Sequence, residues 1–402
     1  MQNKMTNLPQ GWEVKKLEEI ANIKGGKRLP KGKNLLDNNT KFAYIRVADF
    51  QDNGTINLQN IKFINENTYN VLKNYKIYDD NLYISIAGTI GKSGIIPKEL
   101  NGAILTENAV KLEYIQNNIS NKFMYFFTLS NIFKTQIQTS TKIVAQPKLA
   151  ITRLKQIQIP LPPLKEQERI VGILDESFAK IDESIKILEQ DLLNLDELMQ
   201  SALQKAFNPL KDNAKENYKL PQSWEWKSLE EISENISAGG DKPKNCTESK
   251  TAKNQIPVYA NGVNNNGLVG YTDKATIIKP SLTISARGTI GFVCIRKEPY
   301  FPIVRLISLI PCENILCLHY LYFCLNFFIA KGEGSSIPQL TIPKFKSLQI
   351  PLPPLKEQEQ ITSHLDELSS HVKNLKQNYQ AQIKDLQELK NSLLDKAFKG
   401  NL

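Results

Sequence analysis

The sequence predicts an α+β protein made of two β-rich α/β domains and two long antiparallel coiled-coil helices related by pseudo-two-fold symmetry. Three observations support this fold class: a duplication with a period near 200 residues, a coiled-coil pattern at the end of each copy, and β-branched runs within each copy. The 402 residues exceed the size of one ordinary core, and the 41% apolar content is typical of a globular protein.

The duplication consists of three phrases that return in the same order. The second occurrence differs from the first at only a few positions, and the last phrase is unchanged. The pairs are LPQGWEVKKLEEI (8–20) and LPQSWEWKSLEEI (220–232), ISIAGTIG (84–91) and ISARGTIG (284–291), and IPLPPLKEQE (159–168 and 350–359). The offset falls from 212 to 200 to 191 residues, so we expect insertions in the globular part of the first copy.

This duplication sets the expected domain boundaries. The first domain is expected over 1–163 and the first spacer helix over 164–208. The second domain is expected over 209–354, with a linker at 209–219, and the second spacer helix over 355–402.

Each spacer is predicted to be one helix, because prolines exclude helix before it and acidic residues occupy its first turn. Apolar residues then recur at the intervals of a coiled-coil seam. In the first copy these are Leu174, Phe178, Ile181, Ile185, Leu188, Leu192, Leu195 and Met199. In the second copy they are Leu365, Leu368, Val372, Leu375, Tyr379, Leu386, Leu389 and Leu393, with Gln382 as a polar interruption. We expect the two helices to pair with each other; two separate coiled coils with other proteins are the alternative.

Within the domains, β-branched and aromatic runs predict strands over 41–50, 83–88, 282–287 and 303–310. The apolar segments 122–137 and 316–331 each predict one buried helix, at equivalent places in the two copies. Residues 312–330 are interrupted by polar side chains, so we expect a buried helix there rather than a membrane span. The N-terminus lacks the apolar region of a secretory signal.

The composition predicts a reduced, metal-free, cytoplasmic protein. Five cysteines form no CxxC pair, and the three histidines do not cluster with them except near one predicted helix. The net charge of +10 is unevenly distributed, because the spacers carry −5 and zero and the rest of the chain carries +15. Such a surplus in two domains indicates a polyanion bound at two places.

Several motifs resemble catalytic or nucleotide-binding motifs but lack residues that those motifs require. GTIGKSG (88–94) lacks the first glycine of a phosphate-binding loop, and the second copy lacks its lysine and serine. PLPPL lacks the amide and aromatic neighbours of an adenine-methyltransferase loop, and no nuclease cluster or hydrolase triad is visible. We therefore expect no catalytic or metal site. The repeated GTIG is expected to form a tight turn, either purely structural or lying against a phosphate.

Candidate contacts to double-stranded DNA are basic and amide residues in loops. A solvated surface position is the alternative for each of them. The candidates are Lys27, Arg28, Lys31, Lys33, Arg46, Lys92, Lys142, Lys242, Lys244, Asn261, Asn264, Arg287 and Gln339.

Taken together, the paired LP..WE.K.LEEI and IPLPPLKEQE phrases and the L.KAF endings resemble the specificity subunits of type I restriction–modification systems. The resemblance covers essentially the whole chain. It implies a non-catalytic subunit whose two target-recognition domains read the halves of a bipartite DNA site, with the helices as spacers. Differences between the two copies imply a non-palindromic target.

The resemblance also implies partners: two modification subunits, which methylate adenine, and two restriction subunits. S-adenosylmethionine, ATP and Mg would bind those partners, and none would bind this chain. From the invariance of the repeated phrase, we expect contacts to the modification subunits at Pro162, Leu164, Gln167, Pro353, Leu355 and Gln358.

Three other functions remain as alternatives. The chain could serve a fused methyltransferase–nuclease polypeptide outside the type I class, or be an enzyme itself. A purely structural coiled-coil protein is the third, which the positive surplus of the domains opposes.

Overall fold

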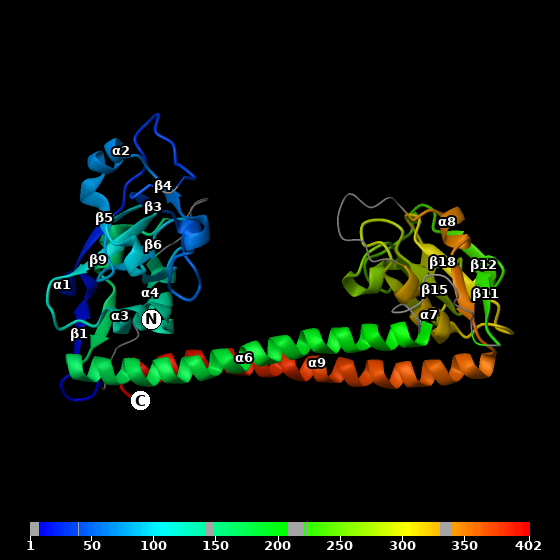
Figure 1. The fold of residues 1–402 in the computed structure, drawn as a ribbon. Helices are drawn as coiled ribbons and strands as arrows, with labels where there is room; N and C mark the ends of the chain where they lie inside the picture. Colours follow the sequence, from blue (N-terminus) through cyan, green and yellow to red (C-terminus); the bar gives the residue numbers. More distant parts are fainter. Residues whose placement is uncertain (1–7, 39, 141–147, 208–220, 222, 330–339) are drawn as a thin grey trace. The chain divides into compact units, whose positions relative to one another are not determined.

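The computed structural model describes residues 8–38, 40–140, 148–207, 221, 223–329 and 340–402. The chain forms two compact units (Figure 1): residues 1–187 with 381–402, and residues 188–380. Each unit therefore contains one sequence repeat, the first half of the helix that follows it, and the second half of the other long helix.

The elements of the first repeat and its helix follow in chain order. They are β1 (Glu13–Lys16), α1 (Leu17–Ile20), β2 (Ala21–Gly25), β3 (Ala43–Ile45), η1 (Val47–Asp49), η2 (Leu58–Asn60), β4 (Lys62–Phe63), α2 (Glu66–Val71), η3 (Lys73–Tyr75), β5 (Lys76–Ile77), β6 (Leu82–Ser85), β7 (Ser93–Ile95), η4 (Lys98–Leu100), β8 (Ala103–Leu105), β9 (Ala109–Tyr114), α3 (Asn121–Leu129), α4 (Asn131–Ser140), α5 (Ile151–Lys155), β10 (Gln158–Leu161) and α6 (Leu164–Phe207).

The second repeat and its helix contain fewer elements. They are β11 (Glu225–Ser228), β12 (Ser233–Ala238), β13 (Ile256–Tyr259), η5 (Asn264–Gly267), β14 (Leu268–Thr272), β15 (Ser281–Ile284), β16 (Val293–Arg296), β17 (Phe301–Pro302), β18 (Ile307–Pro311), α7 (Leu318–Phe328), α8 (Ile342–Lys346), β19 (Gln349–Leu352) and α9 (Leu355–Ala397).

The two repeats have the same sheet topology. The main sheet has the strand order β2-β9-β6-β7 in the first repeat and β12-β18-β15-β16 in the second, with antiparallel neighbours throughout. A smaller sheet contains β4-β3-β8-β5 in the first repeat and β14-β13-β17 in the second. It has one parallel pair, β3·β8 or the equivalent β13·β17. The duplication seen in the sequence is therefore a duplication of the fold.

The opening and closing phrases of each repeat pair with each other. In the first repeat β1 is antiparallel to β10, with Val14 opposite Pro160. In the second, β11 is antiparallel to β19, with Trp226 opposite Pro351. Each two-stranded sheet brings the start of its domain to the start of its long helix, so both phrases serve one joint.

The expected insertions of the first copy are visible as additional elements. Between β4 and β6 the first repeat adds α2, η3 and β5, whereas β14 is followed directly by β15. After α3 it adds α4, which has no counterpart between α7 and α8 among the described residues. The insertions therefore extend existing loops and add one edge strand, β5, to the smaller sheet, while the main sheet keeps four strands in both repeats.

Three predictions about local structure need correction. The run 303–310 forms a strand only from Ile307, because Val304 and Arg305 before it adopt the left-handed conformation. The apolar segment 122–137 forms two helices, because buried Ser130 breaks it: its hydroxyl donates to the Phe127 carbonyl and accepts from the Phe133 N–H. The run 41–50 forms a strand only to Ile45, because the Asp49 carboxylate accepts the Arg46 N–H and turns the chain into η1. The single buried helix of the second repeat, α7, is confirmed.

The long helices begin at Leu164 and Leu355, directly after the repeated prolines. In the first unit the beginning of α6 packs against the end of α9, since Leu174 and Phe398 belong to one core. In the second unit the end of α6 packs against the beginning of α9, where Phe207 and Leu365 share a core. In both units the paired halves therefore run in opposite directions, as predicted.

Ion pairs support the same antiparallel pairing. Lys390 bonds Asp182 in the first unit, and Lys376 bonds Asp196 at 2.5 Å in the second. The predicted seam is buried or half-buried except at three positions of α9: Leu375 and Leu389 are 40% and 46% exposed, and Ile383 is half-buried in place of the exposed Gln382. Over the described part of the chain, none of the helices combines the length and the apolar character that a bilayer span needs.

Candidate nucleic-acid interface

In the first repeat, four loops meet where β2, β3, β6 and β8 end. We call them the strand-end loops. The Lys27 N–H donates to the Leu105 carbonyl at 2.9 Å, and the Thr106 N–H donates to the Ile45 carbonyl at 3.0 Å. The Ile86 N–H donates to the Asn108 carbonyl at 2.8 Å. The topology therefore gathers segments far apart in sequence at one edge of the domain.

The basic cluster of the first repeat lies in the loop after β2. Lys27, Arg28, Lys31 and Lys33 are all exposed. Lys27 lies over the Tyr75 ring, 5.8 Å from its centroid. Its backbone carbonyl accepts from the Tyr44 hydroxyl at 2.8 Å, which anchors the start of the loop.

Arg28 has an acidic neighbour that the sequence did not reveal. Its Nε atom donates to the Glu107 carboxylate at 2.7 Å, although the arginine side chain is 79% exposed. This hydrogen bond and the charge attraction raise the pKa of Arg28 above its usual value. A phosphate bound at Arg28 would have to compete with Glu107.

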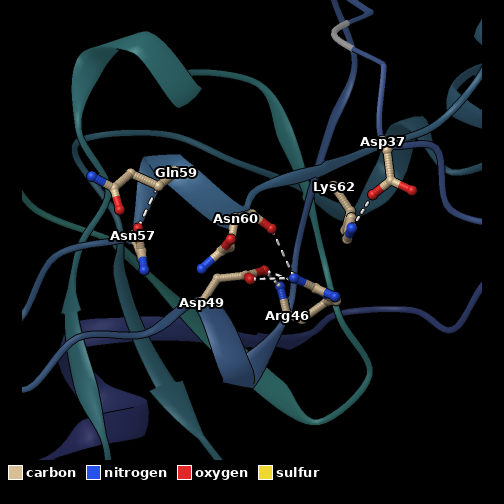
Figure 2. Close-up of polar contacts among 7 residues, drawn as sticks. All are labelled: Asp37, Arg46, Asp49, Asn57, Gln59, Asn60 and Lys62. Atoms are coloured by element: carbon tan, nitrogen blue, oxygen red, sulfur yellow. Dashed lines mark hydrogen bonds and ion pairs between the residues drawn. The ribbon is translucent and has the colours of Figure 1, made fainter.

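Arg46 is used within the domain. It forms two bonds to the Asp49 carboxylate, at 2.5 and 3.1 Å, and donates to the Asn60 carbonyl at 3.0 Å. Figure 2 shows it between η1 and η2, which it links. A structural role therefore accounts for this arginine, because its partner Asp49 is buried.

Arg46 holds in place an amide-rich β3–β4 loop that sequence reasoning missed. Asn53, Gln59 and Asn60 are exposed there, and the Asn57 side chain accepts the Gln59 N–H at 3.0 Å (Figure 2). Its counterpart in the fold is the asparagine-rich β13–β14 loop, which the sequence did single out. Only the shared topology makes the two loops comparable, because their sequences do not align.

Lys92 is half-buried and pairs with Asp52 of the β3–β4 loop at 2.8 Å. It follows the GTIG turn, whose conformation is as predicted. Gly88 and Gly91 have φ values of 74° and 88°, and the Gly91 N–H donates to the Ser85 carbonyl at 2.9 Å. The second turn repeats this geometry, with φ values of 68° and 83° at Gly288 and Gly291. Contact with a phosphate there stays a prediction.

In the second repeat the equivalent strand-end loops include those after β13, β15 and β17, and Asn261 joins these three. Its Nδ2 donates to the Val304 carbonyl at 2.7 Å, and its Oδ1 accepts the Ala286 N–H at 2.8 Å. Both ends of the amide are thus engaged inside the domain. A bidentate contact between the Asn261 amide and an adenine, the pairing that suits an asparagine, would require breaking these bonds.

The other candidates of the second repeat lie on its surface. Asn264, Lys242, Lys244 and Arg287 are exposed. Asn264 lies in the β13–β14 loop, which is held by Arg296: this arginine donates to the Asn266 carbonyl at 2.6 Å and stacks 3.5 Å from the Tyr259 ring centroid. Lys142 and Gln339 lie outside the described residues.

The residues expected to bind modification subunits divide into two groups. Leu164 is half-buried and Leu355 is 36% exposed, so their side chains can be reached. Pro162, Gln167, Pro353 and Gln358 are buried. The structure therefore does not support partner contact through these four side chains.

Gln167 connects α6 to the domain before it. Its Oε1 accepts the Ser120 N–H at 2.9 Å, and its Nε2 donates to the carbonyls of Asn118 at 3.0 Å and Pro162 at 2.9 Å. These bonds join the loop before α3 to the first turn of α6. The side chain is 1% exposed, so all of its bonds lie in the protein interior.

Gln358 makes the equivalent bonds in the second repeat. It accepts the Cys317 N–H at 2.8 Å and donates to the carbonyls of Ile315 and Pro353 at 2.9 and 2.8 Å. The invariance of this glutamine between the repeats is therefore explained by a repeated internal joint. Cys317 and the four other cysteines are free thiols. No cluster of three or more potential metal ligands is present among the residues that the structure describes.

Comparisons with known proteins agree with this architecture. The family model "Type I restriction modification DNA specificity domain" matches residues 9–192 and again 221–385. A putative type I specificity subunit of Mycoplasma pneumoniae is 29% identical over 88% of each chain. One of Haemophilus influenzae is 27% identical over 96% of this chain and 95% of its own.

Solved structures share the fold. A chain from a study of the assembly and conformational transition of the type I restriction–modification system has a TM-score of 0.82 at 20% identity, over 98% of this chain and 100% of its own. The HsdS subunit of Thermoanaerobacter tengcongensis has a TM-score of 0.59 at 21% identity, over the full length of both chains. With two matched domains that cover most of its length, this chain belongs to the type I restriction–modification DNA specificity family.

Proposed function

We propose that the chain selects the DNA sites at which a partner methyltransferase and nuclease act, and that each repeat reads one half of a bipartite, non-palindromic target. The observation that supports this proposal most is the pair of strand-end loop sets. The same sheets carry them in both repeats, yet their side chains differ, as two readers of different sequences require.

The chain itself is proposed to be non-catalytic. Two modification and two restriction subunits would supply methylation and cleavage, with S-adenosylmethionine, ATP and Mg bound on them. The surplus of +15 outside the helices suits contact with DNA phosphates. Leu164 and Leu355, at equivalent places beside the two joints, are our proposed contacts for the modification subunits.

Methylome sequencing of cells that express this chain with its methyltransferase partner tests the proposal. We expect methylated adenines at one bipartite motif that disappears when the chain is absent. Replacing residues 223–349 by the equivalent segment of a relative should change one half of the motif and leave the other half intact. Methylation that does not depend on the chain, or a swap that changes both halves, would contradict the proposal.

A further inference from the structure

The β17–β18 loop of the second repeat contains two adjacent non-glycine residues in the left-handed conformation. Val304 has a φ of 53° and Arg305 a φ of 59°. Positive φ is a genuine outlier for a β-branched residue, and it persists only where the surrounding structure enforces it. The equivalent loop of the first repeat, 106–108, contains no residue with positive φ. The strain is therefore a property of this loop and not of the shared fold.

Three hydrogen bonds hold this Val304–Arg305 turn. The N–H groups of Val304 and Arg305 donate to the carbonyls of Gly240 and Gly239, both at 2.8 Å. Asn261 donates to the Val304 carbonyl at 2.7 Å and is itself fixed by the Ala286 N–H at 2.8 Å. Loops from three other parts of the repeat thus determine where the turn lies.

The side chains of this rigid turn point to solvent. Val304 is 51% exposed, and Arg305 is also exposed. Among the described residues no carboxylate forms an ion pair with Arg305, in contrast to Arg28 of the first repeat. An exposed cation without an acidic partner, on a fixed backbone beside the loops of Lys242 and Arg287, is suited to an anionic or hydrogen-bond-accepting ligand.

We propose that the Val304–Arg305 turn is a base-reading element of the second repeat, with Arg305 contacting a base edge and Asn261 acting as a positioning residue. The proposal rests on the proposed function, because it assumes that this repeat reads a half-site. Phosphate contacts tolerate flexible loops, whereas hydrogen bonds to base edges benefit from a fixed backbone beneath the reading side chain, which Arg305 has. Arginine most often pairs with guanine in this way.

The test measures base preference in the assembled complex of the full-length chain with its methyltransferase partner. DNA libraries randomised at one position of the second half-site at a time are methylated and sequenced. Arg305→Ala should lower the preference at one position by about 5- to 150-fold and leave the first half-site unchanged. Arg305→Lys keeps the charge but lacks the planar fork, so it should lose the preference while largely keeping affinity.

Asn261→Asp keeps the acceptor for the Ala286 N–H and removes the donor to Val304. It should therefore weaken the preference at the same position as Arg305→Ala, an effect that a purely structural role would not confine to one position. Lys297→Ala is the control: it removes a similar exposed positive charge directly after β16 and should leave the base preference unchanged. Unfolding followed by the fluorescence of Trp224 and Trp226 checks that each variant is folded.

The possible failures are distinguishable. An unchanged preference in both Arg305 variants, or an equal loss on all sequences, would overturn the base-reading role and leave the proposed function standing. If the wild-type complex shows no preference at any position of a second half-site, the proposed function fails first.

Discussion

At the scale of single residues, Gln167 and Gln358 explain best why the repeated phrase is unchanged. Each satisfies one backbone N–H and two carbonyls that are enclosed where a domain meets its long helix. A shorter or charged side chain cannot provide one acceptor and two donors at these distances. Two copies of the same joint therefore require the same residue twice.

We expect Gln358→Ala to destabilise the second unit by at least about 1–3 kcal/mol, because it leaves buried polar groups without partners. The three tryptophans provide local probes, since Trp12 belongs to the first unit and Trp224 and Trp226 to the second. In a chain that also carries Trp12→Phe, the fluorescence of Trp224 and Trp226 reports only the second unit. Gln358→Ala should move the unfolding transition of that unit to a lower denaturant concentration. Glu359→Ala, an exposed neighbour, is the control. Equal stability of the two variants would contradict the role of the joint.

A second prediction concerns Glu107, whose carboxylate accepts a hydrogen bond from the Arg28 side chain. Glu107→Gln removes a negative charge from the proposed DNA-binding edge, so DNA affinity should rise and the salt dependence should steepen by about 0.9 in logarithmic slope. Fluorescence anisotropy at several salt concentrations measures both. Glu99→Gln, at an exposed residue of η4 at the opposite ends of the strands, should leave affinity nearly unchanged. A weaker complex for Glu107→Gln would show that Arg28 does not face DNA.

At the scale of elements, the end of α9 completes the core of the first unit. Phe398 is 1% exposed and its ring lies 5.1 and 5.5 Å from those of Phe123 and Phe127. A residue near the C-terminus thus packs against a helix almost 280 positions earlier. The L.KAF ending of the repeat has a packing reason, because Phe207 has the equivalent place beside Tyr320 in the second unit.

Phe398→Ala should destabilise the first unit by about 3–5 kcal/mol through the cavity that it leaves. In a chain with Trp224→Phe and Trp226→Phe, the remaining Trp12 reports this unit, because Trp12 packs against the same core. Leu389→Ala on the same helix is the matched control, since Leu389 is 46% exposed. If both substitutions shift the Trp12 transition equally, Phe398 is not part of this core.

At the scale of the whole molecule, the two long helices α6 and α9 are the segments that an insertion can lengthen without altering either set of strand-end loops. An insertion of four residues in α6 between Phe178 and Met199, matched by four in α9, adds about 6 Å of helix. We expect the gap between half-sites to grow by about two base pairs, at about 3.4 Å each, with both half-sites unchanged. Methylome sequencing of the variant reads gap and half-sites together. A changed half-site sequence would contradict the assignment of recognition to the loops.

The sequence by itself determined the architecture, because periodic signals survive without tertiary information. The duplicated phrases gave the two-domain organisation. The prolines before Leu164 and Leu355 marked the helix starts, and the three–four spacing identified the seam. The sequence also argues against a phosphate-binding loop at GTIGKSG, because the first glycine of that motif is absent. Each of these signals is local, or repeats at a fixed interval, and so can be read along the chain.

Only the tertiary structure decided what individual polar residues do. Arg46 and Asn261 look like DNA contacts in sequence, yet both tie loops together through partners that are distant in sequence or buried. In sequence Arg305 is one basic residue among many, and only its left-handed backbone and its hydrogen bond to Gly239 distinguish it. A polar side chain has the same letter whether it satisfies a buried group or faces solvent. Its role is set by which strands end beside it, and that depends on sheet topology.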